Sequence, residues 1–361
     1  MTSSPEQPDQ QRQAKARTYA RTRRVLYVVD LLIGAAFLVA LLATGASNWL
    51  RDTFAYAYFL QVGLYFLVVL VLYTVVLLPS SFYGGYVLPK RYGLLSQGLR
   101  GWVIDELKGF GLSILLGLLI IEVLYWLIAS NPAWWWLLAA GAMLLFTVVL
   151  ANLAPILILP LFYKLEPLRD QALAARLTAL AARAGQRVRG VYEMNLSAKS
   201  TTANAALMGL GNTRRIMLTD TLIQRYTPDE IEAVLAHELG HHVHRDIPMG
   251  IAIQTGVTLV SFFLADRLLL WLVPRLGYAS IADIATFPLL ALVLGAFMMI
   301  AMPLQNSFSR WRENQADRYA LSLTRAPADF ISMMTKLTDQ NLSEAEPSRW
   351  VELVFYDHPS S

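Results

Sequence analysis

The chain has 361 residues, 56% of them hydrophobic and only 16% charged, and its mean hydropathy is +0.45. This composition lies far from that of an ordinary soluble domain and indicates a membrane protein. The formal net charge is only +4, and the absence of cysteine excludes disulfide bonds and thiolate metal sites.

Six apolar runs approach or exceed the ~20 residues that a helix needs to cross a bilayer. In chain order they are Val25–Ala43, Tyr58–Leu78, Phe110–Ala129, Trp134–Leu159, Ile247–Val273 and Phe287–Leu304. As core helices of a soluble protein they would need polar segments to cover them, and the first half of the chain has few. The first run is too long for a signal-peptide core and lacks a clear cleavage site, which indicates an uncleaved anchor.

These runs predict an all-α multi-pass membrane protein with about six to seven transmembrane helices and a small α+β region in the cytoplasm. The expected parts are a disordered basic segment at residues 1–24, four spans at 25–162, the cytoplasmic region at 163–246, a two-span hairpin at 247–304 and polar helices at 305–361.

The basic residues predict which side of the membrane each loop faces, because cytoplasmic loops carry an excess of Lys and Arg. Residues 1–24 hold six of them, and the loop between the second and third spans holds four. The alternate loops hold few. Both termini and the 163–246 region are therefore expected on the cytoplasmic side.

The cytoplasmic region mixes helix and strand patterns. Leucines recur at helical spacing in Glu166–Gly185, which ends at a glycine. Val188–Glu193 and Arg215–Leu218 have the composition of short strands, and the small, polar stretch Ser197–Gly211 joins them. The region is expected to close with a further helix.

That last helix carries a metal-binding pattern. Thr227 is a good N-cap, and Glu230 completes a capping box with it. The helix then passes through His237-Glu238-Leu239-Gly240-His241, which is the HExxH pattern. Histidines four residues apart lie on one helix face and can bind one tetrahedral zinc ion, while Glu238 is placed to take a proton from a water on the metal.

Two histidines do not complete such a site. The extended pattern with a third histidine fails, because His244 stands where its glycine would be and Ile247 where that histidine would be. His244 follows His241 by one turn and would strain a tetrahedral geometry, so it is expected to pack or hydrogen-bond near the site. His242 points off this face and is expected to face solvent or an interface.

A better third ligand follows the last span. Glu313 and Asp317 are four residues apart on one face of a polar helical stretch, SRWRENQADRYAL. The two intervening spans form a hairpin, so this stretch begins on the same side of the membrane as His237 and His241. Glu313 is the expected third ligand, and Asp317 is expected to accept the second ring N–H of a ligand histidine.

The sequence resembles the type I CAAX prenyl endopeptidases, membrane zinc metalloproteases also described as a-factor-converting enzymes. The resemblance begins at about Tyr86 and rests on motifs in a fixed order. They are YGLLSQGLRGWVIDELKG, LPLFYKLEPL, Asn204-Ala205 followed by Gly209, RRIMLTDTLI, HELGH, SRWRENQAD and a late DHP. The chain stops at Ser361, where the family continues into a further polar helix, so His358 is expected close to a frayed end.

The resemblance implies one Zn²⁺ per chain, held by His237, His241 and Glu313, with Glu238 as the general base. It also implies that the Asn204-Ala205 pair lines the substrate strand.

The same resemblance implies roles for two further residues, His358 and Glu122. His358 would lie near the reacting carbonyl. The helices of the family enclose a water-filled chamber within the membrane, and Glu122 is expected to face it. Glu122 lies mid-span, with no Lys or Arg at its depth to neutralise it.

The implied function is peptide-bond hydrolysis by a membrane-embedded zinc metalloendopeptidase. Its expected partners are the lipid bilayer and a peptide or protein bound as an extended strand, possibly lipidated, with no nucleic acid. The expected location is a bacterial cytoplasmic membrane, with the endoplasmic reticulum as the alternative. A quality-control protease of misfolded membrane proteins is an alternative function. A non-catalytic membrane receptor or chaperone is another, against which the intact Glu238 argues.

Overall fold

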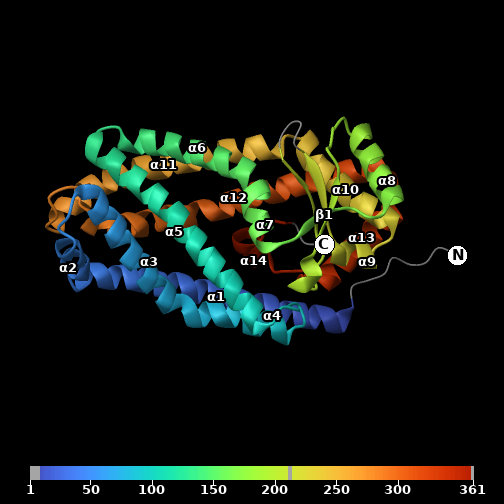
Figure 1. Ribbon diagram of the computed structural model, residues 1–361, viewed down its shortest axis with the longest axis horizontal. Coiled ribbons are helices and arrows are strands. Elements are labelled where there is room, and N and C mark those ends of the chain that lie inside the picture. The colour runs from blue at the N-terminus through green and yellow to red at the C-terminus, as the bar shows by residue number, and fades with distance from the viewer. Residues whose placement is uncertain (1–8, 210–213, 359–361) are drawn as a thin grey trace.

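The apolar runs fold into long helices that lie side by side, and the polar parts of the chain gather at one end of them (Figure 1). The computed structural model describes residues 9–209 and 214–358. Within these residues, six helical segments are long and apolar enough to cross a membrane, which agrees with the six runs of the sequence. They are Gln10–Ala43, Tyr58–Arg91, Leu99–Ser130, Trp135–Phe162, Asp246–Arg275 and Ile284–Thr324.

The first four spans contain two local irregularities. Their elements are α1 (Gln10–Ala43), α2 (Ala46–Thr53), α3 (Tyr58–Phe82), η1 (Tyr83–Val87), α4 (Leu88–Arg91), α5 (Leu99–Ser130), α6 (Trp135–Leu153), η2 (Ala154–Ile158) and α7 (Leu159–Phe162). The segments η1 and η2 are single turns of π-helix. Prolines lie in or beside both turns, and proline removes a helical N–H, so the wider winding near it is expected.

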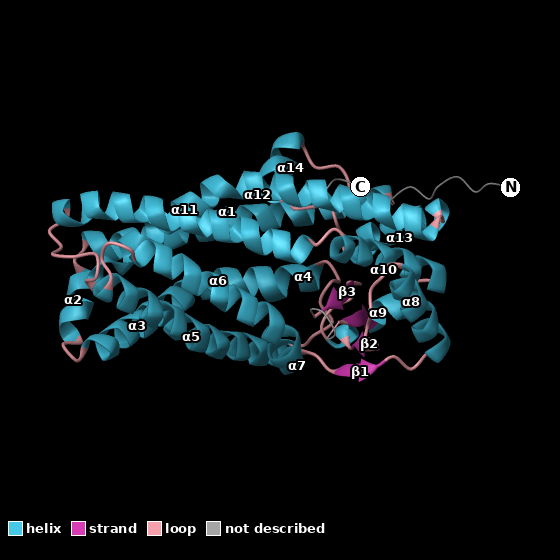
Figure 2. Cartoon of the chain, turned by 90° about the horizontal axis from the view of Figure 1, so that it is seen from above, coloured by secondary structure: helices cyan, strands magenta, loops and turns pink. Residues whose placement is uncertain are grey.

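The polar end is built around a four-stranded sheet (Figure 2). Its elements are β1 (Leu165–Pro167), α8 (Gln171–Arg183), β2 (Val191–Met194), η3 (Leu196–Ala198), β3 (Ala205–Met208), β4 (Arg215–Thr219), α9 (Asp220–Arg225) and α10 (Pro228–Val243). The strand order is β1-β2-β4-β3, with β2 and β4 parallel and the other pairs antiparallel. The strand β3 is therefore at one edge of the sheet.

The C-terminal part returns through the membrane and back to the polar end. It consists of α11 (Asp246–Arg275), η5 (Ile284–Thr286), α12 (Phe287–Thr324), α13 (Pro327–Gln340) and α14 (Arg349–Phe355). The helix α12 is continuous across the expected boundary between residues 304 and 305, although Pro303 lies inside it. One rigid element thus carries both the last span and Glu313.

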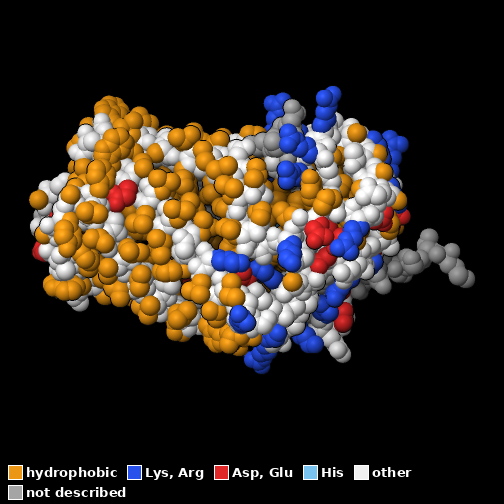
Figure 3. Space-filling model, in the orientation of Figure 1, with side chains coloured by type: hydrophobic (Ala, Val, Ile, Leu, Met, Phe, Trp, Pro, Cys, Tyr) orange, Lys and Arg blue, Asp and Glu red, His pale blue; other side chains and the backbone are white. Residues whose placement is uncertain are grey.

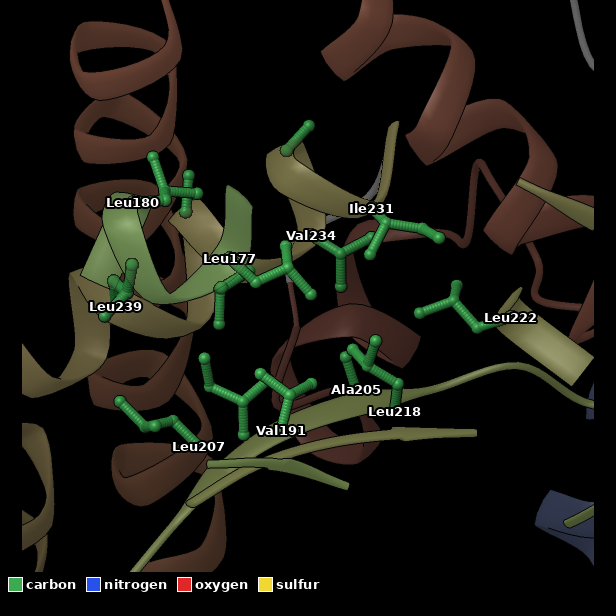
Figure 4. Packing of buried hydrophobic residues seen from close by; sticks show 14 of the residues in the cluster. Leu177, Leu180, Val191, Ala205, Leu207, Leu218, Leu222, Ile231, Val234 and Leu239 are labelled. Carbon is green, nitrogen blue, oxygen red and sulfur yellow. The ribbon is translucent and has the colours of Figure 1, made fainter. Parts of the chain in front are cut away.

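Apolar packing holds the sheet against the helices of the polar end. Leu177 and Leu180 of α8 share one buried cluster with Val191 of β2, and Ala205 and Leu207 of β3 belong to the same cluster (Figure 4). The helical spacing of leucines in α8 predicted this buried face correctly. A second cluster joins the spans around Tyr65, Tyr125 and Trp135, which are fully buried.

The surface divides in the same way. Figure 3 shows hydrophobic side chains covering the part formed by the spans, while most of the Lys and Arg gather near the sheet. This separation is what a helix bundle in a bilayer with a polar region in water requires.

The N-terminal segment differs from expectation. Disorder was expected for residues 1–24, but α1 begins at Gln10, where Asp9 accepts a hydrogen bond from the N–H of Gln11. This part of α1 packs against the C-terminal region, since Ala16 is fully buried and Arg24 pairs with Glu344 at 2.7 Å. A long-range ion pair of this kind has no local pattern, which explains why the sequence did not predict it. Residues 1–8 lie outside the described part.

Two strands also escaped the sequence prediction. The strand β1 has three residues and includes Pro167, and β3 lies within the Ser197–Gly211 stretch that was expected to be a connection. Ala, Leu and Met in β3 are not typical strand residues, and its conformation depends on pairing with β4.

Candidate metal centre

The helix α10 presents two histidines to one point in space. It begins with a complete capping box, in which Thr227 accepts from the N–H of Glu230 and the Glu230 carboxylate accepts from the N–H of Thr227. One turn of helix then separates His237 from His241. Their Nε2 atoms are 3.2 Å apart, and the two rings are nearly perpendicular.

Glu313 of α12 reaches the same point. Its Oε2 is 3.3 Å from His237 Nε2, and its Oε1 is 3.6 Å from His241 Nε2. These three side chains form a group that could hold a metal ion, with ligand atoms within 4.8 Å of one another. The structure thus brings together three residues that are 4 and 72 positions apart in the sequence (from 237 to 241 and from 241 to 313).

Gly240 makes this approach possible. A Cβ atom at this position would lie 2.9 Å from the Cα of Ala316 and 3.2 Å from its Cβ. Both helices contribute a residue with little or no side chain at their closest contact, so their backbones pass near each other. Any larger side chain at position 240 would move α12, and with it Glu313, away from the histidines.

Each histidine donates its second ring N–H to a carboxylate. Asp317 Oδ1 accepts from His237 Nδ1 at 2.8 Å, as the sequence predicts for a ligand histidine. Asp246 Oδ2 accepts from His241 Nδ1 at 2.6 Å. In a neutral ring such bonds fix the tautomer in which Nε2 is the nitrogen that can bind a metal ion, and both Nε2 atoms are directed at the shared point.

Asp246 is a member of the cluster that no motif in the sequence indicates. This residue opens α11 directly after Arg245, whose φ of 58° turns the chain back toward α10. Asp246 is buried and also pairs with Arg312 at 2.8 Å. Its signal in the sequence is an acidic residue five positions after His241, but only the turn at Arg245 brings it against the ring.

The electrostatics of the cluster favour a cation. Burial favours the neutral ring of His237, but the carboxylates of Asp317 and Glu313 outweigh it and raise the pKa of His237 to about 10. Burial and the neighbouring ring of His237 lower the pKa of His241. The two half-buried rings face several carboxylates, and the negative charge of those carboxylates stabilises positive charge at the point between them.

Glu238 and His358 flank the cluster. Glu238 is largely buried, and burial raises the pKa of its carboxyl group, although the nearby rings of His237 and His241 oppose this. His358 Nδ1 lies 3.0 Å from Glu313 Oε2, so the C-terminal segment does reach the site. That contact raises the pKa of His358.

The Asn204-Ala205 pair lies at the start of β3. Asn204 O accepts from the N–H of Thr219 at 3.1 Å, and Asn204 Oδ1 accepts from the N–H of Ala205 at 2.9 Å. Asn341, which follows α13, holds the preceding Ala203 through both of its backbone groups. No sequence pattern singles out Asn341, because its position depends on the packing of α13.

The two remaining histidines of α10 do not join the cluster. His244 donates from Nδ1 to Gly240 O at 2.9 Å and packs edge-on to Tyr319, in the packing role that the sequence suggested. His242, expected at solvent or an interface, is half-buried against β3. Its Nε2 donates to Leu207 O of β3 at 2.8 Å, and burial lowers the pKa of its ring.

Glu122 of α5 lies against α3. A Cβ atom on Gly63 would come within 2.8 Å of its Oε1, so glycine at 63 makes room for the carboxyl group. Its Oε2 is buried without a hydrogen-bond partner among the described residues.

Known protein families match both halves of the chain. Residues 167–361 match the model of peptidase family M48. Residues 5–164 match the model described as CAAX prenyl protease N-terminal, five membrane helices.

Individual relatives agree with these matches. The chain is 29% identical to a Bacillus subtilis protein named as the uncharacterized metalloprotease YhfN, over 96% of this chain and 83% of that one. It is 30% identical to a CAAX prenyl protease 1 homolog of Oryza sativa, over 78% and 67% of the two chains. The same identity links it to the probable CAAX prenyl protease 1 of Schizosaccharomyces pombe, over 78% of this chain but 60% of the yeast protein.

A solved structure shares the fold. The crystal structure of S. mikatae Ste24p matches with a TM-score of 0.88 and 22% identity, over 99% of this chain and 90% of the other.

The close contact of α10 and α12 yields a prediction. Gly240→Ala is expected to weaken metal binding by about tenfold or more, the range found when the support of a metal ligand is disturbed. Gly256→Ala in α11 is the matched control, because a Cβ atom there meets open space. The measurement is retained metal after competition with a chelator. Equal retention by Gly240→Ala and wild-type protein would show that the approach of Ala316 does not set the position of Glu313.

Proposed function

The chain belongs to peptidase family M48 and is a membrane metalloprotease of the CAAX prenyl protease type, and we propose that its metal is a single zinc ion held by His237, His241 and Glu313. The observation that carries this proposal is the spacing of the ligand atoms. Zinc with tetrahedral N and O ligands at its usual bond lengths has ligand–ligand distances of about 3.3–3.6 Å. In the cluster, the two Nε2 atoms are 3.2 Å apart, His237 Nε2 is 3.3 Å from Glu313 Oε2, and His241 Nε2 is 3.6 Å from Glu313 Oε1. Two imidazoles and one carboxylate are also a usual ligand set for catalytic zinc.

The residues around the ion divide the work of hydrolysis. Zinc in this position would supply Lewis acidity toward the scissile carbonyl and toward water. Glu238 takes the proton from the attacking water, since a carboxylate with a raised pKa is a better base near neutral pH. His358, whose pKa is raised by Glu313, donates to the developing oxyanion.

The edge strand β3 provides the place for an extended substrate. An edge strand offers unpaired backbone groups to which a peptide can add as a further strand. Asn204 and Ala205 lie at the beginning of this edge, and α10 packs beside it. We therefore assign the two residues to substrate binding, with main-chain pairing supplying much of the affinity.

The substrate class is proposed from the relatives. Those from S. pombe and O. sativa are named as CAAX prenyl proteases, which supports C-terminal tails, with or without a lipid, as substrates. The B. subtilis relative is named only as a metalloprotease. Quality control of misfolded membrane proteins is the alternative. The bacterial relative, similar over most of both chains, supports a bacterial cytoplasmic membrane over the endoplasmic reticulum.

We place the active site on the cytoplasmic side. Six spans return the chain to the side on which it began, and α1 starts at the same end as the metal centre. The Lys and Arg residues near the sheet in Figure 3 lie at that end, as the positive-inside tendency requires.

We further propose that water reaches Glu122 between the spans. A carboxyl oxygen buried in protein or hydrocarbon without a hydrogen bond is costly, and ordered or mobile water is the usual partner where the protein provides none. The unpartnered Oε2 of Glu122 thus supports a hydrated chamber between α3 and α5 and the remaining spans.

The first prediction of this proposal concerns zinc and the base. Purified protein is expected to hold one zinc ion per chain by elemental analysis. Glu313→Ala should lose metal and activity together, whereas Glu238→Gln should keep metal and lose about 10²–10⁴-fold in turnover, the usual contribution of a general base. Full metal in Glu313→Ala would mean that the third ligand is another residue, and normal turnover by Glu238→Gln would remove Glu238 from the mechanism.

Peptides trapped by Glu238→Gln, identified by mass spectrometry, distinguish C-terminal tails from misfolded membrane proteins.

The second prediction concerns sidedness. A reporter inserted after Tyr278, in the connection between α11 and η5, should appear on the opposite side of the membrane from one inserted at Gly185. The same insertions in inverted vesicles provide the control. Reporters on one common side would contradict the six-span topology.

The third prediction concerns the chamber. In a chain without native cysteine, Glu122→Cys should react with a small membrane-impermeant thiol reagent in folded protein. A cysteine at Leu115 of the same helix, which is 67% exposed, controls for a surface that faces lipid. A Glu122→Cys thiol that stays unlabelled, while cysteines in exposed loops react, would establish dry packing between α3 and α5.

A further inference from the structure

His242 joins the metal-binding helix to the edge strand. It directly follows His241, but its ring turns away from the metal centre and its Nε2 lies 2.8 Å from Leu207 O. A carbonyl oxygen can only accept a hydrogen bond, so Nε2 carries the proton and donates it. Nothing in the proposed chemistry uses this ring.

The alternation of the backbone shows which groups of β3 face outward. The N–H of Thr219 donates to Asn204 O next to the strand, and the register then pairs Ala206 with Met217 and Met208 with Arg215, so even-numbered residues bond the neighbouring strand β4. In an antiparallel pair the direction alternates, and odd-numbered residues present their N–H and C=O at the free edge. Ala205 and Leu207 are such residues, and so is the preceding Ala203.

Side chains cover this edge at both ends. At one end, Asn341 Oδ1 accepts from the N–H of Ala203 at 2.8 Å, and Asn341 Nδ2 donates to Ala203 O at 3.1 Å. At the other end, His242 bonds Leu207 O. Between them lies Ala205, whose N–H donates to the adjacent Asn204 side chain and whose C=O accepts no hydrogen bond from another described residue. Along the free edge, side chains of other elements therefore bond Ala203 and Leu207, whereas Ala205 between them remains available to a substrate.

We propose that Asn341 and His242 bracket the free edge of β3 and confine backbone pairing with the substrate to a window centred on Ala205. This inference rests on the proposed binding of substrate along β3. The two residues act as positioning residues. They decide which substrate residue lies opposite Ala205, and therefore which peptide bond lies at the metal.

The bracket has a defined consequence for recognition. A substrate strand places one residue opposite Ala205 and another, two positions away, opposite Leu207. The first donates its N–H to Ala205 O. The second cannot donate its N–H to Leu207 O, because the His242 ring occupies the position from which that N–H would have to approach. The protein should therefore require a backbone N–H in the first substrate residue and be indifferent to one in the second.

Removing the bracket should permit a slip of two residues. Strand pairing repeats every two residues, so a register shift of two keeps the same substrate faces toward the protein. With Leu207 O available, a substrate can pair one step further along β3, and the scissile position moves with it.

The test begins with product mapping. The probe is casein, followed by a ten-residue quenched-fluorescence peptide spanning the main casein cleavage site of purified wild-type protein. His242→Leu removes the donor at similar size, and His242→Gln keeps an N–H near the position of Nε2. His242→Leu is expected to add a cleavage site two residues from the main one, whereas His242→Gln keeps the wild-type pattern. His244→Leu, at the same helix end, is the matched control, and metal content is measured in each variant.

An ester scan then locates the backbone contacts. Each backbone N–H of the peptide is replaced in turn by an ester oxygen, except at the scissile bond. Wild-type protein should lose about fivefold in kcat/KM at one position, the effect of a single hydrogen bond, and nothing two residues away. His242→Leu should become sensitive at both. Asn341→Leu, tested in the same way, should gain sensitivity on the opposite side of the first position.

The outcomes separate the two levels of the proposal. An ester scan of wild-type protein with no sensitive position would contradict substrate pairing with β3 itself. A sensitive position in wild-type protein, together with an unchanged scan and unchanged products in metal-loaded His242→Leu, would overturn the bracket alone. Sensitivity at both positions in wild-type protein would also overturn it, because the substrate would then displace His242.

Discussion

The whole centre depends on how closely α10 and α12 can approach each other. The two histidines come from one helix and the carboxylate from another, and no covalent link or shared loop fixes the distance between them. Contact of the two backbones at Gly240 and Ala316 fixes it instead. Packing densities in protein interiors leave no slack for an added methyl group at such a contact. The glycine of HELGH is therefore a structural requirement of the metal centre.

The carboxylates behind the histidines serve a second requirement, which is orientation. His237 is held by Asp317 from α12, and His241 by Asp246 from α11. Arg312 balances the buried charge of Asp246. Because α11 and α12 are both membrane-spanning helices, the geometry of the centre is tied directly to the bundle. A movement of either span would change the direction of a ligand ring.

The parts that the sequence predicted are those with a local physical cause. The capping box at Thr227, the buried leucine face of α8 and the one-turn spacing of His237 and His241 each follow from helical geometry alone. Glu313 required one more step, the reasoning that a two-span hairpin returns the chain to the same side. Membrane topology thus supplied long-range information that a soluble sequence would not have offered.

What the sequence did not reveal depends on tertiary contacts. Asp246 becomes a partner of His241 only through the left-handed turn at Arg245. The strand β3 forms because β4 pairs with it. His242 was assigned to solvent or an interface because it points off the metal face, and that direction was correct. Its hydrogen-bond acceptor, the carbonyl of Leu207, lies on β3, and the sequence did not predict that strand.

The helix α10 therefore has two roles, and as one rigid element it keeps them in fixed relation to each other. One face carries the two histidines of the proposed zinc site, and the neighbouring face, through His242, holds the strand β3 beside them. A substrate bound against β3, as we propose, would be aligned with the metal site by this one helix, without a separate loop whose motion would change the register. Main-chain pairing discriminates poorly between side chains, so a short, bounded edge restricts cleavage by position and extended conformation more than by sequence.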